Sequence, residues 1–170
     1  YRKHLCIIGK QGRGKSVLLS QLFTYYSKDN ENFCLLSFVG SSTFSQSINQ
    51  ILYRWVIEMN VYLGNSVEID YQDNFFIIKE LFQKAVEQIN KRNVKVYVFL
   101  DGVDNFQGQQ SQSAFLTWLT PNFHFIGTCT SKIYDKVSFY NNEMCKYDME
   151  LFNFEDCSLL IQGFEKYYNI

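Results

Sequence analysis

The sequence is poor in the features that mark several large classes of protein. It holds one proline and four arginines, and its formal net charge is −1 over 170 residues. No run of basic residues occurs, so composition gives no electrostatic reason to expect nucleic acid or an anionic membrane as a direct partner. No stretch of 18 apolar residues occurs either. We therefore expect no membrane-spanning helix.

Paired cysteines are also missing. The five cysteines are scattered, odd in number and contain no Cys-x-x-Cys pair. This pattern disfavours both a disulfide framework and a zinc site, and indicates free thiols in a reducing, cytoplasmic compartment. The chain begins without Met and without a signal-peptide pattern. We interpret it as a fragment of a larger multidomain protein.

What the sequence does contain is an alternation of short apolar runs with amphipathic stretches. Apolar runs predict buried strands at residues 5–8, 33–39, 94–100, 123–127 and, more weakly, 146–151. Helical spacing of apolar residues marks residues 15–26, 44–59 and 75–89. The alternation predicts an α/β fold with a parallel sheet covered on both faces. We assign residues 1–150 to this core and 151–170 to the start of a following helical region.

The first apolar run leads into a glycine-rich loop that matches the phosphate-binding pattern G-x-x-x-x-G-K-[ST]. The residues in or directly after the pattern are Gly9, Lys10, Gln11, Gly12, Arg13, Gly14, Lys15, Ser16 and Val17. The loop lies between a predicted strand and a predicted helix, which is the context that the pattern requires. Glycines let backbone amides approach phosphate oxygens, and the positive end of a helix dipole favours an anion. We predict that the loop binds ATP, or less favourably GTP.

Two residues of the loop have side chains suited to a nucleotide–metal complex. Lys15 would neutralise the β- and γ-phosphates, and the Ser16 hydroxyl would ligate Mg²⁺. The third strand ends in Asp101, and an aspartate at that point in such proteins holds the Mg²⁺ hydration shell. Asp104, three residues later, would orient or deprotonate an attacking water. The alternative for both aspartates is a solvent-facing turn, because Asp-Gly is a common turn dipeptide.

Hydroxyl groups and a cation follow the fourth strand. Thr128 or Thr130 would sense the γ-phosphate if this strand lies beside the acidic one, and Lys132 would reach it. An ordinary strand end is an equally good reading of this stretch. His4 and His124 lie among apolar neighbours, and each is expected to serve packing or to make a satisfied hydrogen bond.

Five stretches together resemble a NACHT domain of the STAND class of signalling NTPases. They are the loop at 9–16, FVGSS at 38–42, LDGVD at 100–104, WLTPN at 118–122 and TSK at 130–132. Two of them, the stretches at 38–42 and 118–122, are similar to the NACHT modules of telomerase-associated and nephrocystin-type proteins. The resemblance implies a P-loop NTPase three-layer sandwich with a five-stranded parallel sheet in the order 5-1-4-3-2. It also implies ATP/ADP and Mg²⁺ as cofactors, with Thr130 to Lys132 near the γ-phosphate.

By the same resemblance, the chain is expected to act as a slowly hydrolysing nucleotide switch. Its partners would be the nucleotide, other domains of the same polypeptide and further proteins, and nephrocystin-type relatives suggest cilia by analogy. Asn105 stands where the family usually has Glu, and Lys132 stands where it has Arg, whose bidentate fork Lys cannot reproduce. These departures favour an alternative, a nucleotide-stabilised scaffold without turnover. A small-molecule kinase is less favoured, because no arginines cluster to neutralise a transferring phosphoryl group.

Overall fold

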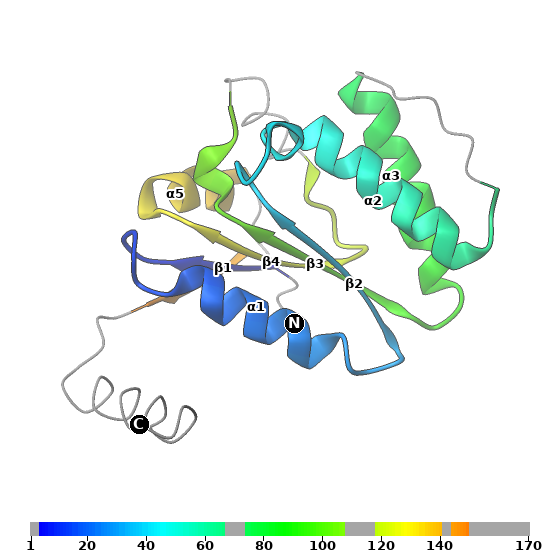
Figure 1. Cartoon of the computed structure of the whole chain (residues 1–170), viewed down its shortest axis with the longest axis horizontal. Coiled ribbons are helices and arrows are strands. Elements are labelled where there is room, and N and C mark those ends of the chain that lie inside the picture. The colour runs from blue at the N-terminus through cyan, green and yellow to red at the C-terminus, as the bar shows by residue number, and fades with distance from the viewer. Residues whose placement is uncertain (1–3, 67–73, 108–117, 141–143, 150–170) are drawn as a thin grey trace.

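The computed structural model describes residues 4–66, 74–107, 118–140 and 144–149, and every structural statement concerns these ranges. Strands and helices alternate along the chain (Figure 1). The strands are β1 (His4–Ile8), β2 (Asn32–Phe38), β3 (Lys95–Asp101), β4 (His124–Cys129) and β5 (Met144–Asp148). The α-helices are α1 (Lys15–Tyr26), α2 (Ile48–Leu63), α3 (Phe75–Asn90) and α5 (Ser131–Tyr140). Two short 3-10 helices, η1 (Thr43–Ser45) and η2 (Val103–Asn105), follow β2 and β3.

The five strands form one parallel sheet. Their order is β2-β3-β4-β1-β5, and each neighbouring pair is parallel. Read from the β5 edge, the order is 5-1-4-3-2. Because parallel strands end at the same edge of a sheet, the residues that follow β1, β3 and β4 meet on one side of the molecule. The predicted α/β class with a five-stranded parallel sheet is confirmed.

Helices cover both faces of this sheet (Figure 1). On one face, α1 packs Leu19 against Ile7, Phe99 and Ile126. On the other face, α2 and α3 bury a group of large aromatic side chains against the sheet, namely Trp55, Phe82, Trp118, Phe123 and Phe125. The two tryptophans stack with their ring centroids 5.8 Å apart, and both are fully buried. Burial of aromatic area on this scale is a main source of core stability.

Both histidines lie among rings, as their apolar neighbours predict. His124 stacks on Tyr97 at a centroid distance of 4.6 Å, and His4 packs against Phe123 at 5.8 Å. Within the ranges that the structure covers, no helix has the length and apolar character needed to cross a bilayer.

The predicted helix over 44–59 is wrong at its start. Thr43–Ser45 is a separate 3-10 turn, and α2 begins only at Ile48, with Ser47 as its N-cap. The Ser45 hydroxyl accepts a hydrogen bond from the Ser42 amide at 2.9 Å, which completes a capping box at the start of this turn. The fifth strand lies at 144–148 instead of 146–151. The helical region predicted for 151–170 lies outside the described residues.

Candidate functional site

The glycine-rich loop joins β1 to α1 at the carboxyl edge of the sheet. Gly12 and Gly14 have φ angles of 80° and 81°, in the left-handed region that side chains rarely adopt. A Cβ atom at either position would meet nothing within 4 Å, so the backbone conformation, and not crowding, calls for glycine. The Lys15 side chain folds back over the loop, where its Nζ donates to the carbonyl oxygens of Gly9 at 2.6 Å and Lys10 at 3.1 Å.

The N-terminus of α1 is left open to an anion. Gly14 is the N-cap, it provides no side-chain cap, and the first turn holds no acidic residue. The first backbone donor within the helix is the Leu18 amide, which bonds to the Gly14 carbonyl at 3.0 Å. The amides of Lys15, Ser16 and Val17 therefore precede the helical ladder. Such amides, together with the helix dipole, form a favourable environment for a phosphate or a carboxylate.

The acidic end of β3 lies directly beside this helix start. The Ser16 hydroxyl donates to Asp101 Oδ2 at 2.7 Å, although the two residues are 85 positions apart in the sequence. The other carboxylate oxygen, Oδ1, accepts a hydrogen bond from the Thr128 hydroxyl at 2.6 Å. The structure thus brings together Ser16 and Asp101, the two residues predicted to share a metal ion.

Asp104, in η2 after β3, is bonded to the residue that follows the neighbouring strand β4. Its Oδ1 accepts hydrogen bonds from both the amide and the hydroxyl of Thr130, at 2.9 and 2.8 Å. Thr130 directly precedes α5, and its carbonyl oxygen accepts from the Tyr134 amide at 3.0 Å. Asp104 therefore lies at the N-terminal end of α5. Lys132 is exposed on α5 and does not line the cavity described next.

These groups surround a polar cavity of about 600 Å³. Its lining comes from the loop with the start of α1, from the end of β3 with η2, and from the end of β4. The lining residues are Gln11, Gly12, Arg13, Gly14, Lys15, Ser16, Val17, Asp101, Gly102, Asp104, Asn105, Thr128 and Thr130. Gly9 and Lys10, at the other end of the predicted loop, lie outside the lining and contribute carbonyl oxygens to Lys15.

Asn105 closes one side of the cavity and packs on two glycines. A Cβ atom on Gly102, whose φ is 70°, would lie 2.7 Å from Asn105 Nδ2, and one on Gly40 would lie 3.3 Å from Asn105 Cβ. The Asn105 amide donates to the Val39 carbonyl at 3.3 Å. An amide side chain is a hydrogen-bonding group without basicity, so it cannot take a proton from water in this place.

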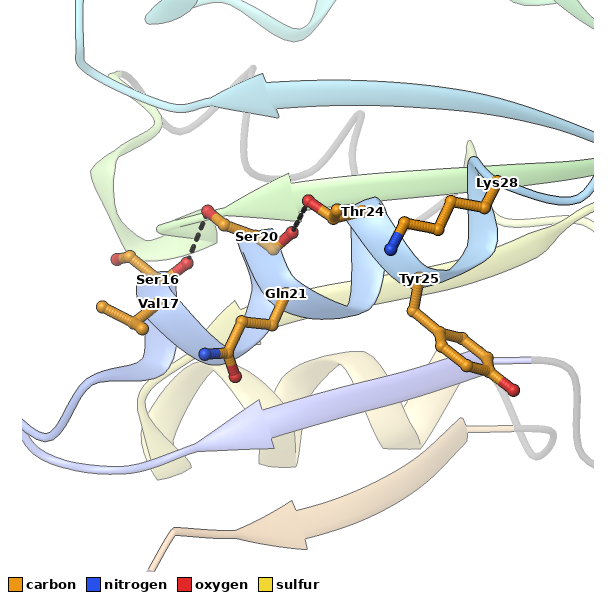
Figure 2. Close-up of a pocket in the computed structure, with 7 residues that line it drawn as sticks. All are labelled: Ser16, Val17, Ser20, Gln21, Thr24, Tyr25 and Lys28. Atoms are coloured by element: carbon orange, nitrogen blue, oxygen red, sulfur yellow. Dashed lines mark hydrogen bonds between the residues drawn. The ribbon is translucent and has the colours of Figure 1, made fainter. Parts of the chain in front are cut away.

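A second hollow of about 500 Å³ runs along the outer side of α1 (Figure 2). Two of its hydroxyl groups are occupied within the helix: Ser20 donates to the Ser16 carbonyl at 2.8 Å and Thr24 to the Ser20 carbonyl at 2.9 Å. Figure 2 shows them in one row, with Tyr25 and Lys28 at the far end of the helix. The hydroxyl protons of Ser20 and Thr24 are therefore not available to a ligand in this hollow.

Beneath the loop, two cysteines belong to the core. Cys6 on β1 and Cys129 on β4 are both buried. A hydrogen bond with Cys129 and burial raise the pKa of Cys6 well above its ordinary value. A neutral, buried thiol is a poor nucleophile, so Cys6 contributes to packing.

The donors at the cavity suit a hard cation that also binds a ligand. Among the described residues, no group of three or more His, Cys, Asp and Glu side chains could hold a metal ion without further ligands. Ser16 and Asp101 instead offer one hydroxyl and one carboxylate. Mg²⁺ is commonly held in this way, by one or two protein oxygens together with phosphate oxygens and water.

Sequence reasoning missed two contacts at this site. The sequence left open whether Thr128 or Thr130 would sense the γ-phosphate or whether this stretch is an ordinary strand end, and in the structure the Thr128 hydroxyl bonds to Asp101. The Arg13 guanidinium donates to the Met149 carbonyl at 2.9 Å and so ties the loop to the residue that follows β5. No local pattern announces either contact, because each depends on how strands distant in the sequence are aligned.

Fold and site together define an α/β protein with a polar cavity at the carboxyl edge of a parallel sheet. A family model described as nephrocystin 3, N-terminal matches residues 2–132, which is more than half of the chain. The chain belongs to this nephrocystin 3 N-terminal family. The matched range includes the loop, Asp101, Asp104 and Thr130. A comparison with curated proteins found no match.

Proposed function

We propose that this chain is the nucleotide-binding core of a P-loop NTPase of the NACHT type, which binds ATP or ADP with Mg²⁺. The observation that carries the proposal is the contact between Ser16 Oγ and Asp101 Oδ2 at 2.7 Å, at the open N-terminus of α1. It places a hydroxyl, a carboxylate and three helix-start amides around one cavity. That combination matches the chemistry of a polyphosphate that arrives with a divalent cation.

Each group has a distinct task in this proposal. The amides of residues 15–17 would receive phosphate oxygens, and Lys15 would exchange its two carbonyl partners in the loop for phosphate. Ser16 and Asp101 would hold Mg²⁺, which when bound supplies positive charge to the phosphates. Gly12 and Gly14 maintain the loop conformation that the amides need. Because these two glycines hold the loop in that conformation before the ligand binds, the loop backbone needs little reorganisation.

In a larger signalling protein, this core would act as a slowly hydrolysing switch. Asp104 is the group that would orient water, and Thr130 fixes its Oδ1 with two hydrogen bonds. One observation favours a second candidate, a nucleotide-stabilised scaffold: the neighbouring cavity residue is Asn105, which cannot act as a base. Under either function, the partners would be other domains and proteins in the cytoplasm, with the cilium suggested by the family.

The proposal is tested by nucleotide binding to the full-length protein, measured by calorimetry with ATP and ADP in the presence of Mg²⁺. Lys15→Ala should weaken binding about 10- to 150-fold, because a hydrogen bond to a charged group contributes about 1.5–3 kcal/mol. Lys28→Ala, at the far end of α1, serves as the matched control and should bind like the wild type. If the wild-type protein bound neither nucleotide, or if Lys15→Ala bound equally well, the proposal would be overturned.

Single-turnover phosphate release separates the two candidate functions. The switch requires the wild-type protein to release phosphate faster than Lys15→Ala does. Equal rates, together with clear nucleotide binding by the wild type, would support the scaffold. Binding of the nucleotide should raise the unfolding temperature in both cases, because a ligand that binds only the folded state stabilises it.

A further inference from the structure

A buried hydroxyl connects the ends of β3 and β4 behind the candidate site. The Thr128 side chain is fully buried, with a relative exposure of 0%. Its Oγ1 donates to Asp101 Oδ1 at 2.6 Å and accepts from the Gly102 amide at 2.7 Å. Buried polar groups cost stability unless they are paired, and here the hydroxyl proton and one lone pair both have partners.

These two bonds fix the direction in which the hydroxyl points. A threonine hydroxyl has one proton, and the Gly102 N–H can only donate, so the proton must go to Asp101. Oδ1 of the carboxylate is thereby occupied on the side of β4. Oδ2 is the oxygen that faces Ser16, at 2.7 Å. Leu100 is in register with Gly127 across the β3–β4 pairing, so Thr128 lies next to Asp101. The orientation of the Asp101 carboxylate is thus set by Thr128, on the side away from Ser16.

We propose that Thr128 is a positioning residue for the divalent cation. It holds Asp101 in the one rotation that presents Oδ2 beside the Ser16 hydroxyl, and it does not contact the phosphate itself. This inference rests on the proposed function and deepens it, because it assigns the control of metal affinity to a residue outside the set of metal ligands. Groups that hold ligating carboxylates in place typically change metal affinity 10- to 100-fold when they are removed.

Four variants of the full-length protein, three at position 128 and one control, isolate the role of the hydroxyl. Thr128→Val keeps the shape of the side chain and removes both hydrogen bonds, whereas Thr128→Ser keeps them. Thr120→Val is the matched control, because the Thr120 hydroxyl is buried with no hydrogen-bond partner within the described residues. Thr128→Ala also removes the hydroxyl but puts no methyl group in its place, so its effect on binding does not depend on how the valine packs.

The first measurement is the Mg²⁺ concentration at which ATP binding is half-maximal. We expect Thr128→Val and Thr128→Ala to raise it about 10- to 100-fold, and Thr128→Ser and Thr120→Val to stay near the wild type. ATP binding without Mg²⁺ should change little in all four, because the loop amides and Lys15 are untouched. A purely structural role for Thr128 would weaken binding with and without Mg²⁺ alike.

The second measurement needs no ligand. Amide hydrogen exchange at Gly102 should speed up in Thr128→Val, where the amide loses its acceptor, and not in Thr128→Ser. Unchanged Mg²⁺ dependence in both Thr128→Val and Thr128→Ala, with normal nucleotide binding by the wild type, would overturn the positioning role alone. A wild-type protein that binds no nucleotide would overturn the proposed function and this role with it, even if exchange at Gly102 behaves as expected.

Discussion

Gly127, in the middle of β4, should tolerate no side chain without a loss of stability. The glycine lies between Leu100 of β3 and Cys6 of β1 in the sheet. A Cβ atom added there would overlap the ring of Phe125, with Cε1 at 2.7 Å, and would come within 3.3 Å of the Leu100 carbonyl oxygen. The ring is fully buried and packs edge-on against Trp118 at 6.1 Å, so it cannot move aside freely.

The expected cost of Gly127→Ala follows from these contacts. Overpacking of a core typically costs about 1–3 kcal/mol. Alanine recovers roughly 0.5 kcal/mol of this by lowering the entropy of the unfolded chain. The net loss of about 0.5–2.5 kcal/mol corresponds to a fall of about 1–10 °C in the unfolding temperature of a domain of this size.

The assay is thermal and urea unfolding of Gly127→Ala, Phe125→Leu and the double variant. If the overlap with the ring is the cause, the smaller leucine should relieve it. The double variant should then be more stable than the sum of the two single effects predicts, by about 0.5–3 kcal/mol. Additive effects within about 0.5 kcal/mol would refute the reasoning, because residues that do not interact behave in that way. A Gly127→Ala protein as stable as the wild type would refute it as well.

Two further predictions concern α3 and β2. Asn74→Ala should lower the free energy of unfolding by about 0.5–2 kcal/mol, because Asn74 Oδ1 caps α3 by accepting a hydrogen bond from the Phe76 amide at 2.9 Å. Asn65→Ala, at a position outside the helices, is the comparison. Equal stability of Asn74→Ala and the wild type in urea unfolding would contradict the prediction. Burial, and to a lesser degree Asp29, raise the pKa of the Cys34 thiol to about 11. Its alkylation at pH 8, followed by peptide mass spectrometry, should be about 100-fold slower than in the denatured chain, since only the thiolate reacts. The stabilising effect of the neutral thiol should be complete below about pH 9 and lost as the pH rises through about 11.

The parts of the fold that could be predicted are those with a strong local pattern. β1, the glycine-rich loop and α1 form one continuous signal, and β3 is an uninterrupted apolar run that ends at Asp101. The start of α2 could not be predicted from apolar spacing, because the apolar residue at position 44 fits the helical period. Hydrogen bonds around Ser45 form a separate 3-10 turn at residues 43–45, and the spacing of apolar residues gives no sign of these bonds.

In the site too, some residues could be predicted from a local pattern and others could not. Ser16 and Asp101 could be named from the sequence, since each stands at the end of a recognisable element, and the structure places them in contact. The task of Thr128 could not be named, because three hydroxyl residues, Thr128, Thr130 and Ser131, stand close together at the end of the fourth strand. Only the register between β3 and β4 decides which of them stands next to Asp101 and which next to Asp104.

The bond from Arg13 to the Met149 carbonyl gives the loop a second mechanical attachment. The Met149 amide also donates a hydrogen bond to the Ile8 carbonyl at 2.7 Å. Met149, the residue after β5, is therefore bonded both to β1, the strand before the loop, and to the loop itself. A change in loop conformation that withdraws the guanidinium would remove one of these two fastenings. Such a change in the loop would therefore also affect the residue that follows the edge strand β5, 136 positions further along the chain.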